Sequence, residues 1–588
     1  MPRGGLVVTG IPAHMGPSAD CYNQGKPRLR LWTLTAQVIM ASSRHTPLES
    51  IRKLSQVGVA LSAEKDNDRL MELILESAKE LTNADGGTLY RRTEEDTLVF
   101  EIMLTDSLDI RLGGTSGSTI EFYPLRMFDS EGEPNNKMVA AWAAVTGKTV
   151  NIADAYDSEE FDFSGTRAFD GKTGYRSTSF LTVPMRNPED AVIGVLQLIN
   201  ALDSETGEAV AFGEEDQLLV ESLASQAAIA LTNKRLIDDQ RRLFESFIEL
   251  MAGAIDDKSP YTGGHCRRVP ELTVMLADAA AATKSGPLKD FSMTEKDRYE
   301  LRIAGWMHDC GKVTTPEYVV DKSTKLETIF DRIALVDTRI EVLRRDAELA
   351  MLRRRLQQLQ DGAEIDSSAD AEALRQADDA LLADREFVRQ RNFGGEFMSD
   401  DDKARVREIA ARRWRGEDGE ERDLLSEEEV YNLSVERGTL TPEEREVINH
   451  HIVATIKMLE SLPYPKHLQR VPEFAGGHHE RMDGKGYPRG LTRDQMSVQA
   501  RIMGIADIFE ALTAGDRPYK KAMPISQALV ILGRMKEGNH VDPDLFDIFI
   551  REGIYLDYAK RFLEPEQIDE VDLEAIPGCQ STPAKASA

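Results

Sequence analysis

Two adjacent histidines, His478 and His479, stand immediately before a charged, glycine-rich loop that contains Gly486, Tyr487 and Pro488. Successive residues of a helix point about 100° apart, so adjacent imidazoles cannot share one helix face. They can instead reach two metal ions that lie close together, one histidine for each ion. Taken alone, the pair is equally compatible with a polar surface loop, so the rest of the chain has to decide between these interpretations.

A second candidate is the pair His308 and Asp309, which follows a predicted helix over residues 299–307. The imidazole offers one nitrogen, and the two carboxylate oxygens of Asp309 can bridge two ions. Gly311 releases the chain from the helix, and Lys312 follows closely enough to meet a phosphate oxygen. A histidine followed by an aspartate also occurs by chance in any long chain, so this pair gains weight only with further ligands.

Two more candidates lie on predicted helices. One helix begins after Thr441, an N-cap residue followed by proline and two glutamates, and His451 lies on its apolar face. Asp507 lies among apolar residues of a helix predicted over residues 499–512, where an unpaired buried carboxylate is costly and a metal would remove that cost. The plainer alternatives are a hydrogen-bonded core histidine and an aspartate that faces solvent.

Six residues thus supply four imidazoles, two carboxylates and no thiolate: His308, Asp309, His451, His478, His479 and Asp507. Such donors suit divalent ions of borderline to hard character rather than a structural zinc site built on cysteines. Two ions roughly 3.5–4 Å apart can activate water near neutral pH. We therefore expect a hydrolytic centre with two divalent ions, Fe or Mn in the first place and Ni, Zn or Mg as alternatives.

The region that carries these residues, 245–575, is predicted to be all-helical. The region before it, 50–235, begins with a helical pattern. Short strand-like runs follow at 88–90, 97–103, 149–152, 179–184 and 192–199. Residues 217–255 have apolar residues at helical spacing and are predicted to form one long connecting helix. We expect this helix to pair with its copy in a homodimer, and the alternative is a helix packed in the core of a monomer.

Three other segments differ from these regions in composition. Residues 327–438 are dense in Arg, Glu, Asp and Ala, with helical patterns at 329–360 and 369–389, which predicts a solvated helical insertion with a structural or partner-binding role. Residues 1–45 are rich in Gly, Pro and Ser, and we interpret them as disordered or as a misannotated start. Residues 576–588 are predicted to be a disordered tail.

The composition limits the kinds of partner. The 588 residues are 41% hydrophobic and 29% charged, as expected for a chain with several buried cores, and no apolar run is long enough to span a bilayer. The formal net charge of −29 repels nucleic acid polymers and membrane headgroups, so an anionic ligand must be small and met by a local cluster of Lys and Arg. The four cysteines show no zinc-type spacing, which suits the reducing cytoplasm.

The order of the candidate residues resembles that of an HD-GYP domain. The matching pieces, within residues 245–575, are His308-Asp309-Cys310-Gly311-Lys312, His451, His478-His479, Gly486-Tyr487-Pro488, Asp507 and Arg517-Pro518-Tyr519-Lys520. The resemblance implies an α-helical metallohydrolase that cleaves cyclic di-GMP, a bacterial second messenger, to the linear dinucleotide pGpG or further to GMP. It also implies diguanylate cyclase (GGDEF) domains as protein partners.

The resemblance implies a role for each matching residue. The six donors would hold the metals, and Asp309 and Lys312 would act in catalysis. Lys312 would also bind the substrate, together with four residues of the later motifs: Gly486, Tyr487, Arg517 and Lys520. Family members with three metals use one more histidine, here His265, with a glutamate four residues earlier, where this chain has Tyr261. We therefore expect two metals, with His265 as a conditional ligand or a neighbour of the ligands.

Two other functions are compatible with the same motifs. One is an HD-family phosphohydrolase of another signalling nucleotide, which the Gly-Tyr-Pro loop disfavours. The other is a cyclic di-GMP receptor or scaffold that no longer cleaves its ligand, which the intact set of metal donors disfavours. The insertion at 327–438 departs from the family pattern, which has a short link there, and it could alter access to the site without changing the ligands.

Three stretches of the region 50–235 resemble a GAF domain: 179–184, 191–200 and 212–216. The resemblance implies a small-molecule ligand, and some GAF domains bind cyclic nucleotides through an Asn-Lys…Phe…Asp-Glu signature. Asn200, Phe212 and Asp216 match it, but Ala201 replaces the lysine, and a domain that only dimerises is the alternative. The expected fold is therefore multidomain: an α+β GAF domain with a central antiparallel sheet, a long helix, and an all-α HD-type metallohydrolase domain.

Overall fold

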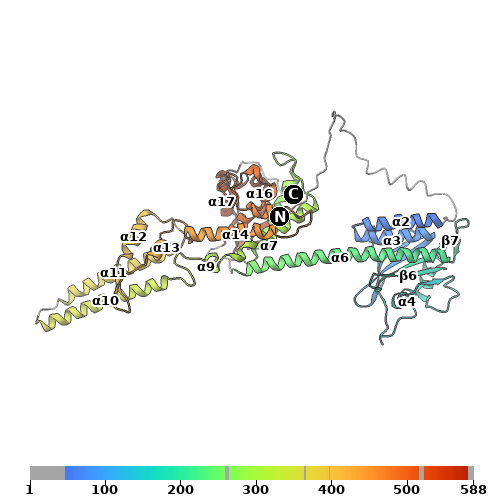
Figure 1. Ribbon diagram of the computed structural model, residues 1–588, viewed down its shortest axis with the longest axis horizontal. Coiled ribbons are helices and arrows are strands. Elements are labelled where there is room, and N and C mark those ends of the chain that lie inside the picture. The colour runs from blue at the N-terminus through green and yellow to red at the C-terminus, as the bar shows by residue number, and fades with distance from the viewer. Residues whose placement is uncertain are drawn as a thin grey trace, which may run out of the picture. The chain divides into compact units, whose positions relative to one another are not determined.

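The computed structural model describes residues 47–258, 264–362, 364, 366–395, 397–515 and 522–579. Two compact units divide the chain, Met1–Arg241 and Arg242–Ala588 (Figure 1). No helix among the described residues is both long and apolar enough to cross a membrane. The predicted N-terminal segment 1–45 and the residues Tyr261, Arg517 and Lys520 lie outside the described residues.

The N-terminal unit is built on an antiparallel sheet with the strand order β3-β2-β1-β7-β6-β5, while β4 pairs with β2 and β8 pairs with β7. The strands are β1 (Ala84–Arg92), β2 (Thr97–Thr105), β3 (Ile110–Gly113), β4 (Leu125–Arg126), β5 (Val150–Ile152), β6 (Phe180–Arg186), β7 (Val192–Leu202) and β8 (Ala209–Val210). All five predicted strand-like runs overlap strands of this sheet. The pattern missed β3, β4 and β8, which are too short to show an alternation of apolar and polar residues.

Helices cover both faces of the sheet and form a separate core on each. One core contains residues of α3 (Asn67–Thr82) and of the N-terminal part of α6 (Glu214–Lys258), and α2 (Pro47–Ala63) packs beside α3. The other core contains α4 (Val139–Thr146) and the aromatic side chains that precede α5 (Ser164–Thr173). This arrangement confirms the predicted α+β fold with a central antiparallel sheet and flanking helices.

The asparagine of the loosely matched nucleotide signature has a structural role in this sheet. Asn200 Oδ1 accepts hydrogen bonds from the backbone nitrogens of Thr178 and Ser179, at 2.7 and 3.2 Å. Its Nδ2 donates to the Tyr175 hydroxyl and to the Arg176 carbonyl, at 2.9 and 2.8 Å. The amide therefore ties the end of β7 to the segment that precedes β6, and its hydrogen-bonding groups are already used within the protein.

The predicted connecting helix is α6 (Glu214–Lys258), slightly longer than the predicted range 217–255. Val220 and Leu223, near its start, are buried in the core of the N-terminal unit. Ile248 and Ala252, near its end, are buried in the core of the C-terminal unit. The start of this helix therefore contributes apolar side chains to the core of the N-terminal unit, and its end contributes to the core of the C-terminal unit.

Within the described residues, the C-terminal unit is helical, as predicted, apart from one short β-hairpin in the insertion, which the all-helical prediction missed. Its main helices are α7 (His265–Ala282), α8 (Glu295–Met307), α9 (Glu317–Val320), α14 (Pro442–Glu460), α15 (Val471–Gly476), α16 (Val498–Thr513), α17 (Ile525–Glu537), α18 (Pro543–Arg551) and α19 (Ile554–Phe562). One continuous core joins most of these helices. The capping box predicted at Thr441 is present, since its hydroxyl accepts from the backbone nitrogen of Glu444 and the Glu444 side chain accepts from the Thr441 nitrogen.

The insertion forms a substructure with its own core. It contains α10 (Ile333–Gln360), α11 (Ser367–Asn392), α12 (Asp400–Ala410), the hairpin β9 (Arg413–Arg415) and β10 (Glu421–Asp423), and α13 (Glu427–Leu433). The two long helices confirm the predicted helical patterns and lie side by side (Figure 1). A buried cluster that includes Val336, Ile340, Phe387 and Leu424 stabilises their base, so the insertion is more than a solvated hairpin.

One prediction about the C-terminal end is wrong in part. The predicted disordered tail begins at residue 576, but Ile576 is 3% exposed and belongs to the core of the C-terminal unit. The carbonyl oxygen of Gly578 accepts a hydrogen bond from Lys536 Nζ at 2.6 Å. A lone isoleucine in a Gly- and Pro-rich stretch carries no periodic pattern, and only packing shows that it is buried.

Candidate metal centre

The elements of the C-terminal unit place the predicted donors in one buried region. His265 begins α7, His308 caps the end of α8, and Asp309 follows it directly. His451 comes from the buried face of α14, whereas the adjacent His450 is exposed, as the helical pattern predicted. The remaining donors follow α15 or lie on α16: His478, His479 and Asp507.

Three of the histidines are held in the same way. His308, His451 and His478 each place Nδ1 against the carbonyl oxygen three residues earlier in the chain, at 2.7, 2.5 and 2.6 Å. A carbonyl oxygen can only accept, so Nδ1 carries the proton in each ring. In the neutral ring the lone pair of Nε2 is then the one that a metal can bind, and the backbone fixes the orientation of the ring.

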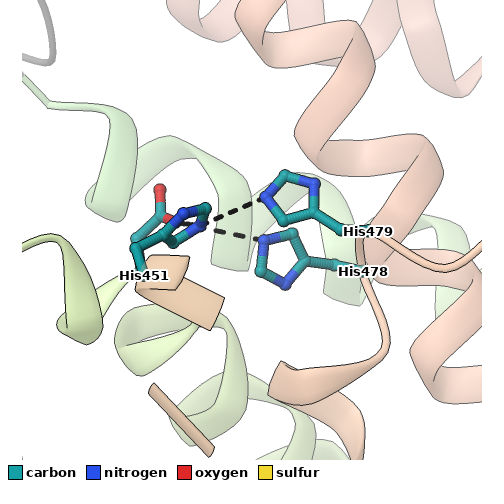
Figure 2. Close-up of side chains that lie close together, drawn as sticks. His451, His478 and His479 are labelled. Carbon is teal, nitrogen blue, oxygen red and sulfur yellow. Dashed lines mark hydrogen bonds and ion pairs between the residues drawn. The ribbon is translucent and has the colours of Figure 1, made fainter. Parts of the chain in front are cut away.

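Asp309, His451, His478 and His479 form the first group of donors, with ligand atoms that all lie within 4.8 Å of one another. His451 Nε2 is 3.3 Å from Asp309 Oδ1 and 3.2 Å from His479 Nε2. Figure 2 shows the three imidazoles converging. Adjacent histidines were expected to reach different ions, but the turn after α15 brings both His478 and His479 into this one group.

His265, His308 and Asp309 form the second group. His265 Nε2 lies 3.2 Å from His308 Nε2 and 3.3 Å from both Asp309 Oδ2 and Asp507 Oδ1. The imidazole of His265 therefore points directly at the other donors. Asp309 belongs to both groups, because its two oxygens face opposite sets of imidazoles.

The donors fit a site for divalent cations. Nε2 of His308 faces Nε2 of His265 at 3.2 Å, and His451 faces His479 at the same distance. Two lone pairs at this distance repel each other unless a cation or a proton lies between them. In addition, Asp309 Oδ1 and His478 Nε2 are buried and have no hydrogen-bond partner among the described residues. Buried polar atoms of this kind need an explanation, and a bound metal supplies it.

The pKa shifts differ between two parts of the centre, one around Asp309 and His308 and the other around His478 and His479. Burial alone would raise the pKa of Asp309, but Lys312 and the imidazoles outweigh it and hold the pKa well below its usual value. Although burial opposes it, Asp309 raises the pKa of His308 to about 9. On the other side, burial lowers the pKa of His479 to about 4 and holds that of His478 well below its usual value. Imidazoles with so low a pKa stay neutral and are ready to bind a metal at neutral pH.

Lys312 and Tyr487 lie at the edge of the centre. Lys312 Nζ donates to Asp309 Oδ2 at 2.6 Å, so the ammonium is close to the shared carboxylate. The Tyr487 ring stacks on His479, with 4.8 Å between the ring centres. A pocket of about 450 Å³ begins here and is lined by His478, His479, Arg481, Lys485, Gly486, Tyr487, Asp507, Ile508, Ala511, Leu512 and His540. The predicted residues Arg517 and Lys520 lie outside the described residues.

Sequence reasoning missed Glu510, although it follows Asp507 by one turn on α16. Its side chain is 1% exposed, and its carboxylate contacts His265 Nδ1 directly. The second oxygen accepts from Arg268 Nε at 2.6 Å. Glu510 therefore orients His265 as the backbone carbonyls orient the other imidazoles. The sequence did contain a signal for Glu510: it is a second acidic residue on the same apolar helix, three positions after Asp507.

Glu480 was also missed, and it holds the loop after the paired histidines. Its residue is 3% exposed, and its carboxylate accepts from the backbone nitrogens of Arg489 and Leu491 at 2.7 and 2.8 Å. Gly486 packs against this turn so closely that an added Cβ would lie 2.5 Å from the Cα of Glu480. The predicted Gly-Tyr-Pro loop is thus a packed element that fixes the position of Tyr487.

A helical unit with such a group of donors follows, along the chain, an α+β unit built on a central sheet, which defines a two-domain protein. A GAF domain model matches residues 66–231, and an HD domain model matches residues 427–545. The chain therefore contains a GAF domain followed by an HD domain. The HD match includes His451, His478, His479 and Asp507, whereas His308 and Asp309 precede it because the insertion lies between them.

Several curated proteins are similar to part of the chain. A 3'3'-cGAMP-specific phosphodiesterase 3 of Vibrio cholerae is 44% identical over 18% of this chain and 23% of its own length. A probable cyclic di-GMP phosphodiesterase of the same organism is 35% identical over 23% of this chain and 32% of its own length. A cyclic di-GMP phosphodiesterase of Thermotoga maritima is 35% identical over 19% of this chain and 30% of its own length. The chain thus spans less than a third of these relatives.

Proposed function

We propose that the HD domain is a metal-dependent phosphodiesterase that hydrolyses cyclic di-GMP to the linear dinucleotide pGpG. One observation carries the proposal: Asp309 places one oxygen 3.3 Å from His451 Nε2 and the other 3.3 Å from His265 Nε2, between the two groups of imidazoles. A carboxylate in this position can bridge two ions. Relatives named as cyclic dinucleotide phosphodiesterases support the class of substrate.

Seven residues would hold the metals: His265, His308, Asp309, His451, His478, His479 and Asp507. Nitrogen and carboxylate donors without thiolates favour Fe or Mn. When bound, a pair of divalent ions supplies Lewis acidity toward the phosphate and lowers the pKa of water. The protein contributes the fixed orientation of the imidazoles and a buried setting for the donors.

The other residues of the site would bind and orient the dinucleotide. Lys312, whose ammonium already lies 2.6 Å from the shared carboxylate, would neutralise charge that develops on the phosphate. Tyr487 offers a flat aromatic face beside the metal centre, and Gly486 lets the loop approach it closely. Arg481 and Lys485 line the same pocket and provide the local cationic cluster that an anionic ligand needs on a chain of net charge −29.

A turnover assay tests the proposal directly. The full chain is purified without oxygen, loaded with Mn²⁺ or Fe²⁺, analysed for metal, and mixed with cyclic di-GMP. We expect hydrolysis to pGpG, and we expect the double variant His308→Ala and Asp309→Ala to lose both metal and activity. A fully loaded protein that does not cleave cyclic di-GMP would contradict the substrate. A double variant with full activity would place the reaction elsewhere in the chain.

The second candidate is hydrolysis of 3'3'-cGAMP, because three of the relatives are named as specific for that dinucleotide. The two substrates differ in one base, so the metal centre serves both and the pocket decides between them. The ratio of kcat/KM for cyclic di-GMP and for 3'3'-cGAMP separates these candidates.

We also propose that the protein is a homodimer regulated through its GAF domain. Along α6, apolar side chains recur every seven residues and are at least 44% exposed: Ile229, Leu236, Leu243 and Leu250. A seven-residue apolar repeat is the spacing with which two helices pair. Sedimentation tests this in a chain whose residues 346–376 are replaced by a short Gly-Ser linker, so that α10 cannot contribute to pairing. If the Leu236→Glu and Leu243→Glu double variant of this chain sediments as the unsubstituted chain does, pairing through α6 is contradicted.

A further inference from the structure

The outward face of α10 carries a row of leucines that the metal centre does not explain. Leu349, Leu352, Leu356 and Leu359 are 41%, 49%, 57% and 63% exposed. Their spacing of three, four and three residues is that of the a and d positions of a coiled coil. We call these four residues the outer leucine row.

The row lies opposite to the face of α10 that packs against α11. The inward face includes the buried Val336 and Ile340 and continues through Leu343, in the core of the insertion. With 3.6 residues per turn, the leucines of the outer row lie on the far side of the helix from these residues. The helix is therefore apolar on two faces, and only one of them is covered by the described part of the chain.

We propose that the outer leucine row pairs with the same row of a second copy of this chain, in a parallel coiled coil. The charges on either side of the row support a second copy as the partner. Glu348 and Arg353 flank the row at the g and e positions, five residues apart. In a parallel pair, g of one helix lies beside the following e of the other, so Glu348 meets Arg353 of the second copy twice by symmetry.

Glu348 and Arg353 differ from most charged residues of the hairpin formed by α10 and α11, which form ion pairs within it. Many other charged residues of α10 and α11 are paired within the hairpin, for example Arg355 with Asp370 at 2.8 Å and Arg389 with Asp337 at 2.6 Å. Glu348 and Arg353 form no ion pair with any other described residue and are both exposed. Since α10 is already folded against α11, pairing would not require the helix to become ordered.

Disulfide cross-linking tests this surface separately from α6. Leu352 is replaced by Cys in a full-length chain whose Cys21 and Cys579 are Ser, leaving only the buried Cys266 and Cys310. In a parallel pair the two Leu352→Cys side chains face each other, so mild oxidation should give a covalent dimer rapidly. The matched control is Ala373→Cys, an exposed position on α11. Cross-linking at Leu352→Cys no faster than at the control would overturn the proposal.

A charge exchange tests the identity of the partner. In the Leu352→Cys chain, Glu348→Arg alone or Arg353→Glu alone should slow cross-linking roughly fivefold, because each places like charges side by side. The two substitutions together should restore the rate, since the pair is re-formed with its signs exchanged. A double variant that stays as slow as the single ones would overturn the parallel pairing. Phosphodiesterase activity is measured separately and does not enter this test.

Discussion

At the scale of single residues, the centre depends on side chains that are oriented before any metal binds. Each Nδ1 of His308, His451 and His478 is held by a carbonyl of its own chain segment. Asp309 then joins the two groups of imidazoles. His265 differs, because the carboxylate of Glu510, on another helix, holds its Nδ1.

We expect Glu510→Gln to weaken metal binding at the group that contains His265 by about 10–100-fold, the usual cost of losing such an outer hydrogen-bond partner. The amide keeps the shape of the side chain but loses the charge that faces His265 Nδ1 and Arg268. Competition with a metal chelator measures the affinity, and Glu552→Gln, at an exposed position, is the control. Unchanged affinity together with a native melting temperature would contradict this role.

At the scale of elements, the loop after the paired histidines depends on one position without a side chain. Gly486 lies against the backbone of Arg481 and Glu480, with no room for a Cβ. We expect Gly486→Ala to raise KM strongly, because the loop moves Tyr487. The metal content should fall less than in the His308→Ala and Asp309→Ala double variant, because Tyr487 contacts only one donor, His479. Gly253→Ala is the control, since its nearest neighbouring atom to an added Cβ is 3.9 Å away. An unchanged KM would show that the loop does not shape the substrate pocket.

Also at the scale of elements, a buried lysine, Lys325, lies where the insertion begins. Lys325 is 1% exposed, and its Nζ donates to the carbonyl oxygens of Leu433 and Val435 at 3.0 and 2.7 Å. Burial lowers the pKa of Lys325 to about 8, from 10.5. Because the folded pKa is the lower one, the contribution of this group to stability is full above pH 10.5 and is lost as the pH falls to about 8.

We therefore expect the parent chain to gain stability relative to Lys325→Met when the pH rises from 8 to 10.5. Urea unfolding midpoints at both pH values measure the difference. Lys466→Met, at an exposed lysine, should show no such change relative to the parent. A constant difference between the parent and Lys325→Met across this range would contradict the depressed pKa.

At the scale of the whole molecule, the GAF domain, the HD domain and the insertion each have a core of their own. All the candidate metal donors belong to the C-terminal unit, and the tip of the α10–α11 hairpin lies beyond the buried residues of the insertion core. Replacing residues 346–376 by a short Gly-Ser linker keeps Val336, Ile340 and Phe387 in place. We expect parent metal content and turnover in this variant, and loss of either would show that the hairpin tip supports the site.

Much of this organisation could be predicted from the sequence, since it depends on short-range patterns. The strands β1, β2, β5, β6 and β7, the long α6, and the helices of the insertion follow from apolar periodicity and caps within each segment. The candidate metal donors follow from the chemistry of their side chains. Asp507 and His451 were candidates because an ionisable residue on an apolar helix face needs a partner.

The grouping of these donors was decided only by the tertiary structure. Residues up to 245 positions apart in the sequence meet there, and no local pattern specifies which imidazole faces which. The packing of α7 against α16 brings Glu510 to His265 and turns Nε2 of His265 toward Asp309. The sequence by itself determined which side chains could bind metals, and the packing of distant helices determined that Asp309 stands between two sets of them.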